Sequence, residues 1–182
     1  MRRLIGRRLQ VLEQNDFALL EGIGGECARA ITFLDSGQAL PSSNTGNDVQ
    51  WLSVQAVVAL LDERPGRPML ATEEGLRLVL AGAQYKLPVV SDGGCIGLPL
   101  NGTPSSDILK PAISAVEDSP VNEGFCMTLA EAVQLGPTKA NVHQVAGRAF
   151  LLVERYDRLS NAQGHRQRLH QEDFCQALSV VP

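Results

Sequence analysis

The chain has 182 residues, of which 44% are hydrophobic and 20% are charged, and its formal net charge at pH 7 is −4. This length accommodates one or two small domains with a buried core. The charge balance shows no basic stripe for nucleic acid, no apolar run approaches the roughly 18 residues of a membrane span, and no apolar export region follows the basic cluster at residues 2–8, so a cytoplasmic protein is predicted.

The first part of the chain is predicted to contain helices, one strand and a linker. Apolar periodicity favours helices near residues 3–12 and 15–23, and a strand at Cys27–Leu34. Residues 36–47 are rich in Gly, Ser, Pro and Asn, as is typical of a linker. These elements predict a small subdomain at the N-terminal end.

A strong helix is predicted after the linker. Asp48 is placed to begin it, it runs from Val49 to about Glu63, and Pro65 and Gly66 end it. One face carries an apolar stripe at helical spacing, which we assign to packing alone: Trp51, Val54, Val58 and Leu61.

Between Leu76 and Val90 the pattern predicts a β-hairpin with a tight turn of small residues. Ala81, Gly82 and Ala83 have no bulky side chain, so their N–H groups can approach an anion closely, as in phosphate-binding loops. By itself the segment favours an ordinary hairpin turn. The run from residue 95 to 100 is predicted to extend the same sheet.

A strand with one lysine and a helix with an early glutamate come next. Residues 106–111 are predicted as a short strand that carries Lys110 near its end, and Pro120 is suited to begin a helix with Glu123 in its first turn. Kinases use such a strand lysine, held by a helix glutamate, to contact nucleotide phosphates. Taken alone, the two residues favour an ordinary ion pair.

The last part predicts two strands, near residues 140–144 and 150–154, and a short amphipathic helix after Asp173. The second strand runs into the charged segment 154–158, whose free backbone groups can pair with an adenine edge, although a solvated turn is the default interpretation. Strands, one main helix and further strands predict an α+β fold with an antiparallel sheet.

The cysteines are widely separated and form no C-x-x-C spacing. We expect reduced core residues rather than disulfide or zinc ligands. No histidine pair has metal-ligand spacing either. The residues concerned are Cys27, Cys95, Cys126, Cys175, His143, His165 and His170.

Five of these segments, in order, resemble the HipA family, the serine/threonine kinase toxins of bacterial toxin–antitoxin pairs. The matching sequences are LAGAQYKLP, PSSDILKP, NEGFCMTLA, VERYDR and RLHQEDFCQAL. Nearer the N-terminus, FALLEGIGGEC also resembles a family motif, with Glu26 where the family has aspartate. The resemblance implies a kinase N-lobe over residues 73–182, an antiparallel sheet with one main helix, preceded by a shortened N-terminal subdomain over residues 1–72.

The resemblance also implies roles for single residues. The loop from Ala81 to Lys86 would cover the ATP phosphates, Lys110 would contact them, and Glu123 would hold Lys110. The adenine would be bound at Glu154 and at the backbone of Tyr156, where the family usually has phenylalanine. The residues expected to bind ATP with Mg²⁺ are Ala81, Gly82, Ala83, Gln84, Lys86, Lys110, Glu154 and Tyr156.

Two features depart from the family pattern. Val79 stands where the family commonly has an autophosphorylated serine, so we expect that switch to be lost. The chain also ends at Pro182 without an H-x-D, D-F-G or G-D-x-x-x-x-N pattern, so no catalytic residue or metal ligand is predicted in it. The chain alone is therefore expected to bind ATP weakly and not to transfer phosphate.

Three interpretations remain open at this point. The first is a HipA-like kinase fragment. The second is a non-catalytic module that docks a HipB-like antitoxin or a separately encoded kinase C-lobe, as the apolar segment 177–182 and an uncovered cleft side suggest. The third is a gene remnant without a role.

Overall fold

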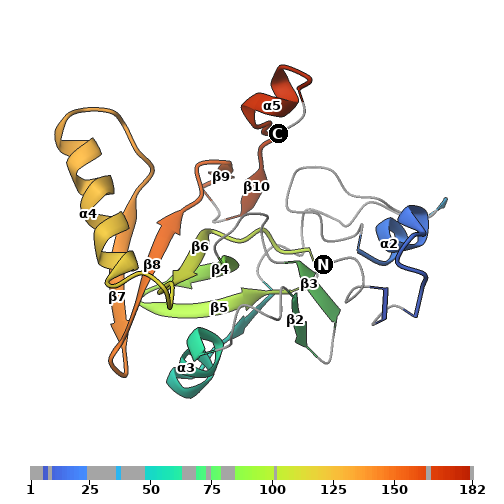
Figure 1. Ribbon diagram of the computed structural model, residues 1–182, viewed down its shortest axis with the longest axis horizontal. Helices are drawn as coiled ribbons and strands as arrows, with labels where there is room; N and C mark the ends of the chain where they lie inside the picture. The colour runs from blue at the N-terminus through green and yellow to red at the C-terminus, as the bar shows by residue number, and fades with distance from the viewer. Residues whose placement is uncertain are drawn as a thin grey trace.

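The computed structural model describes residues 6–7, 10–23, 36–37, 48–62, 69–72, 75–78, 85–100, 102–162 and 165–180. In this part the protein contains a six-stranded antiparallel sheet of order β1-β5-β4-β6-β8-β7 and two separate two-stranded sheets, β2-β3 and β9-β10 (Figure 1). The elements are α2 (Asp16–Ile23), β1 (Val49–Trp51), α3 (Val54–Asp62), β2 (Met69–Thr72), β3 (Gly75–Leu78), β4 (Leu87–Asp92), β5 (Cys95–Pro99), β6 (Asp107–Pro111), α4 (Ser119–Ala132), β7 (Ala140–Val145), β8 (Arg148–Glu154), β9 (Arg158–Ser160), β10 (Arg166–Arg168) and α5 (Phe174–Ala177). The predicted α+β fold with a kinase-like antiparallel sheet is confirmed.

The two faces of the sheet at β6 and β8 have different neighbours: α4 covers one, and the other packs in the main hydrophobic core. Residues directly opposite one another in an antiparallel pair share a face, and Lys110 of β6 is opposite Leu151 of β8. Leu151 lies near Gly124 of α4, which places Lys110 on the same face as that helix. The preceding residue of β6, Leu109, therefore faces the other way. There it packs in the main hydrophobic core, which consists of Leu60, Leu87, Val89, Leu98, Leu109 and Phe150.

Helix α4 lies close against β7 and β8 because Gly124 faces them (Figure 1). A Cβ atom added at Gly124 would meet Cγ2 of Val142 at 2.5 Å. The helix begins after Asp118, which has a left-handed backbone (φ 49°), and Pro120 lies in its first turn, as predicted. The Ser119 hydroxyl accepts a hydrogen bond of 2.8 Å from the Ile113 N–H and ties this start to the end of β6.

The helix predicted from Val49 begins five residues later than expected. Residues 49–51 form β1, which pairs with β5, and the N-cap is Ser53, whose hydroxyl accepts a hydrogen bond of 3.2 Å from the Ala56 N–H. The predicted packing stripe is wrong at Trp51 and Val54, which are 49% and 59% exposed, whereas Leu61 is partly buried and packs against the main core. The buried side chains of α3 are instead Val57 and Leu60.

The hairpin predicted between Leu76 and Val90 does not form as one unit. Strands occur near both ends of this stretch, but β3 pairs with β2, whereas β4 pairs with β5 and β6. The two strands therefore belong to different sheets. The small-residue turn at 81–84 lies outside the described residues.

Other predictions near the ends of the chain have mixed outcomes. The helix near residues 15–23 is confirmed as α2, and the short helix after Asp173 is confirmed as α5, with a capping box between Asp173 and Gln176. The strand predicted at Cys27–Leu34 lies outside the described residues. The core placement of the cysteines is wrong for Cys95 and Cys126, which are exposed, and Cys175 is only half-buried.

The predicted division at residues 72 and 73 stays a prediction. β1 and α3, from the first predicted domain, contribute to the six-stranded sheet and its core. The side chain of Arg148 at the start of β8 also donates hydrogen bonds of 2.6 and 2.7 Å to both carboxylate oxygens of Asp62 at the end of α3. Within the described part of the chain, no helix is long and apolar enough to cross a membrane.

Candidate functional site

The lysine and glutamate singled out in the sequence lie together between β6 and α4. Nζ of Lys110 forms a hydrogen-bonded ion pair with Oε1 of Glu123, and the two side chains are 18% and 33% exposed. The register of β6 turns Lys110 toward α4, and the close approach of α4 at Gly124 brings Glu123 within reach. The Lys110 side chain is thus held in place and stays partly exposed.

The end of β8 presents backbone groups rather than a side-chain site. The N–H of Glu154 donates to the Lys139 carbonyl at 2.8 Å, and its carbonyl accepts from the Thr138 hydroxyl at 2.7 Å. Its carboxylate is 3.7 Å from Nζ of Lys139 in an exposed pair. Because Glu154 is opposite Asp107, its side chain lies on the face away from Lys110.

Tyr156 follows in the turn between β8 and β9. Its side chain is largely exposed. Within the described part of the chain, its backbone N–H has no hydrogen-bond acceptor. The groups that this turn offers to a ligand are therefore the N–H of Tyr156 and the second lone pair of the Glu154 carbonyl.

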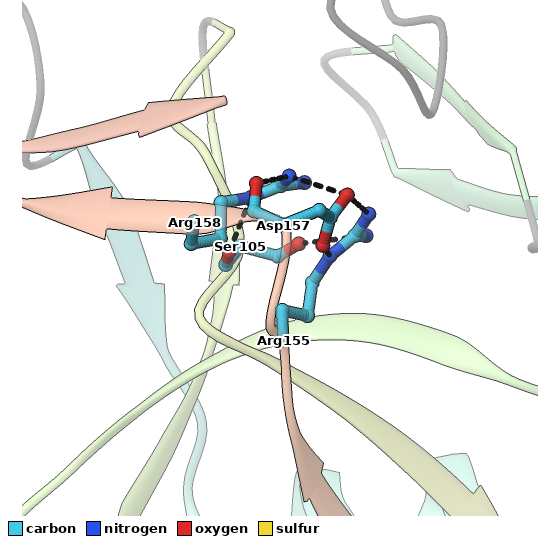
Figure 2. Close-up of polar contacts among 4 residues, drawn as sticks. All are labelled: Ser105, Arg155, Asp157 and Arg158. Carbon is cyan, nitrogen blue, oxygen red and sulfur yellow. Dashed lines mark hydrogen bonds and ion pairs between the residues drawn. The ribbon is translucent and has the colours of Figure 1, made fainter. Parts of the chain in front are cut away.

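The charged residues around Tyr156 form a buried cluster, so the solvated-turn interpretation is wrong for them. The carboxylate of Asp157 accepts two hydrogen bonds from Arg155, at 2.9 and 2.6 Å, and one from Arg158, at 2.8 Å (Figure 2). Arg158 also donates through Nε to the Ser105 carbonyl at 3.0 Å. The three charged side chains are only 4 to 5% exposed. The sequence signal that could have predicted this buried cluster was the alternation of arginine and aspartate after an apolar strand.

The electrostatics of this cluster follow from its burial and its charges. Burial raises the pKa of Asp157, but the hydrogen bonds and charges of Arg155 and Arg158 outweigh it and hold that pKa below its usual value. Burial, with the nearby charges of Arg155 and Arg168, lowers the pKa of Arg158 to about 10, although Asp157 opposes the change. The cluster anchors the backbone on both sides of Tyr156.

A cavity of about 740 Å³ lies on the face of the sheet opposite Lys110. Of the predicted ATP-binding residues that the structure describes, Glu154 alone lines it. Its wall includes Asp107, whose carboxylate accepts hydrogen bonds from the Ser91 and Ser106 hydroxyls at 2.6 and 2.5 Å, and the stacked rings of His143 and Phe150. The sequence analysis assigned none of these residues a binding role.

The remaining predicted ligands belong to the loop before β4. Lys86 is half-buried directly before that strand. Ala81 to Gln84, and Val79 at the serine position, lie outside the described residues. A role for this loop in covering phosphates stays a prediction.

Comparison with known proteins adds independent information. Residues 78–182 match the model of the HipA-like C-terminal domain family. This chain belongs to that HipA-like family. The match covers more than half of the chain and includes β6, α4 and β8. The resemblance deduced from the five motifs is therefore confirmed.

The HipA-like chain has curated relatives named as kinases. It is 44% identical over 183 residues to the “Putative kinase Y4mE” of Sinorhizobium fredii, covering 100% of this chain and 44% of that protein. It is 28% identical over 172 residues to the serine/threonine-protein kinase toxin HipA of Shewanella oneidensis, covering 93% and 38%. The chain spans less than half the length of either relative.

A solved structure shares the fold of the HipA-like chain. It is the complex of HipA, HipB and operator DNA from the Shewanella oneidensis MR-1 toxin–antitoxin system, with a TM-score of 0.74 and 25% identity. The similarity covers 98% of this chain and 41% of that one. The chain is therefore a HipA-like, kinase-related protein by sequence and by fold.

Proposed function

We propose that this chain is the ATP-binding lobe of a HipA-like serine/threonine kinase of the toxin–antitoxin type. The observation that carries the proposal is the pairing of Lys110 with Glu123 across the β6 and α4 elements. A strand lysine held by a helix glutamate is the arrangement with which kinases contact nucleotide phosphates. The proposal implies a cytoplasmic protein, because ATP is available there.

The described residues fit ATP at two separate points. The Lys110 ammonium is oriented by one carboxylate and retains two further N–H donors for phosphate oxygens. The N–H of Tyr156 is available to donate a hydrogen bond to an adenine ring nitrogen, and the Glu154 carbonyl can accept a second hydrogen bond from the adenine amino group. The buried cluster around Asp157 keeps these backbone groups in position.

Magnesium is the other group that the kinase resemblance implies. Among the described residues, no three His, Cys, Asp or Glu side chains come together in a way that would hold a metal ion. No step through Mg²⁺ is therefore assigned to these residues. The role assigned to Lys110 is electrostatic contact with phosphate oxygens.

The direct test is a calorimetric titration of the purified chain with ATP in the presence of Mg²⁺. We expect saturable binding that Lys110→Ala weakens at least about tenfold and that Glu123→Gln weakens less. Lys139→Ala is a matched control, since within the described residues the side chain of this lysine forms only the exposed pair with Glu154. Equal affinity of the wild type and Lys110→Ala would exclude the assigned site.

A HipB-like antitoxin is the partner that we propose for this protein. The supporting observation is that the structural relative was solved together with HipB and operator DNA. Size-exclusion chromatography of the chain mixed with a HipB-like protein tests this. Co-elution is expected, and separate elution at micromolar concentration would favour a separately encoded kinase C-lobe as the partner.

A further inference from the structure

Helix α4 carries a row of exposed apolar side chains on its outer surface. The row, here called the α4 stripe, consists of Val121, Phe125, Leu129 and Val133, which are 48%, 65%, 52% and 59% exposed. Their spacing of four residues aligns them along one side of the helix. Figure 1 shows α4 at the margin of the fold, with the sheet on only one side of it.

The α4 stripe is not needed to attach the helix to the sheet. The side of α4 that faces β7 and β8 is formed by Pro120 and Gly124, which are buried. The stripe lies on the solvent-exposed side of the helix and extends over about 18 Å, or three helical turns. Single exposed apolar residues are common, but a continuous row of this kind marks an interaction surface.

The charge around the α4 stripe has one sign. Residues 111–138 contain four acidic and no basic residues, so their formal charge equals the net charge of −4 of the whole chain. Glu123 is paired with Lys110. The other three, Glu117, Asp118 and Glu131, are exposed, and none of them forms an ion pair with any described residue.

We propose that the α4 stripe docks a basic amphipathic helix of a partner protein, with an apolar row flanked by Lys or Arg. Apolar contact along three turns supplies the attraction, and the acidic flanks select a basic partner over an acidic one. A second copy of this chain does not provide such a helix from α2, α3, α4 or α5, none of which contains Lys or Arg. We assign the stripe to another protein, and self-association through the basic cluster at residues 2–8 is the competing outcome of the test.

The test measures fluorescence anisotropy of a labelled amphipathic peptide of Leu and Lys, about four helical turns long. Its counterpart with Glu in place of Lys is the charge control. We expect saturable binding of the Lys peptide only, weakened at least about tenfold by Phe125→Ser combined with Leu129→Ser. Glu117→Gln combined with Glu131→Gln should weaken binding and reduce its dependence on salt.

The matched control variant is Phe174→Ser on α5, because Phe174 is 86% exposed and distant from the stripe in sequence. It should bind the Lys peptide as the wild type does. Circular dichroism of the stripe variant confirms that α4 is retained. Absence of Lys-peptide binding at millimolar concentration, equal binding of the Glu peptide, or equal loss in Phe174→Ser would overturn the proposal.

Sedimentation velocity of the chain alone tests whether a second copy of the chain binds to the α4 stripe instead. A monomer is expected at concentrations at which the Lys peptide binds. The competing partner is a second copy of the chain, whose basic cluster could contact the acidic flanks of the stripe. This cluster consists of Arg2, Arg3, Arg7 and Arg8. A dimer that the Phe125→Ser and Leu129→Ser pair abolishes would assign the stripe to self-association and overturn the hetero-partner proposal.

Discussion

Two groups of charges near the proposed nucleotide contacts differ in burial and in how many of their hydrogen bonds are used within the protein. The Lys110 and Glu123 pair is partly exposed and joins one donor to one acceptor. The Asp157 cluster is almost fully buried, and its carboxylate accepts from two guanidinium groups. The first leaves donors available for a ligand, whereas the second uses its hydrogen bonds inside the protein. The lysine pair therefore suits the proposed contact with a ligand, and the Asp157 cluster suits a positioning role.

The largest expected effect is that of Asp157→Ala. This change leaves Arg155 and Arg158 buried without their shared carboxylate, which should lower the free energy of unfolding by about 3 to 5 kcal/mol. Urea denaturation followed by circular dichroism measures it. Asp62→Ala is the matched control, since it removes an exposed carboxylate from Arg148, and it should cost much less. Similar losses in both variants would show that burial does not distinguish the clusters.

Acidification should reveal the same carboxylate. The pKa of Asp157 in the folded protein lies below the ordinary value of 3.8, so its contribution to stability is complete above pH 3.8 and is lost as pH falls through the lower folded value. The free energy of unfolding should therefore fall below about pH 4, and part of that fall should be absent in Asp157→Ala. Urea titrations from pH 7 to pH 2 measure both curves. Parallel curves would contradict the assignment.

Lys110→Ala, unlike Asp157→Ala, should change ATP affinity more than stability. Because the pair with Glu123 is partly exposed, the free energy of unfolding should change by no more than about 1 kcal/mol. ATP affinity should nevertheless fall at least about tenfold, which calorimetry measures. A loss of stability as large as that of Asp157→Ala would instead make the lysine a structural residue.

The smallest effect is expected at the Tyr156 side chain. Tyr156→Phe should leave ATP affinity unchanged within about twofold, because the proposed contact is through the backbone N–H and the side chain is 74% exposed. Tyr156→Pro removes that N–H and should weaken binding, as measured in the same titration. If Tyr156→Phe weakened binding as much as Tyr156→Pro, the contact would belong to the phenol.

Short-range patterns determined several parts of this protein. Pro120 predicted the start of α4, whereas Glu123, expected in the first turn, is the fifth residue of the helix. Asp173 with Gln176 produced the capping box of α5. The five ordered motifs determined the family, and the Lys110 and Glu123 pairing followed from the resemblance. These features depend on residues within one or two turns of each other, or on a motif order that the sequence records directly.

Only the tertiary structure decided which strands pair and which charges are buried. Residues 49–51 form β1 because β5 offers an edge to pair with, and β3 and β4 enter different sheets although they are adjacent in sequence. Arg155 and Asp157 are buried because Ser105, some fifty residues earlier, lies beside them. Pairing and burial depend on distant partners, so local propensity and periodicity do not contain them.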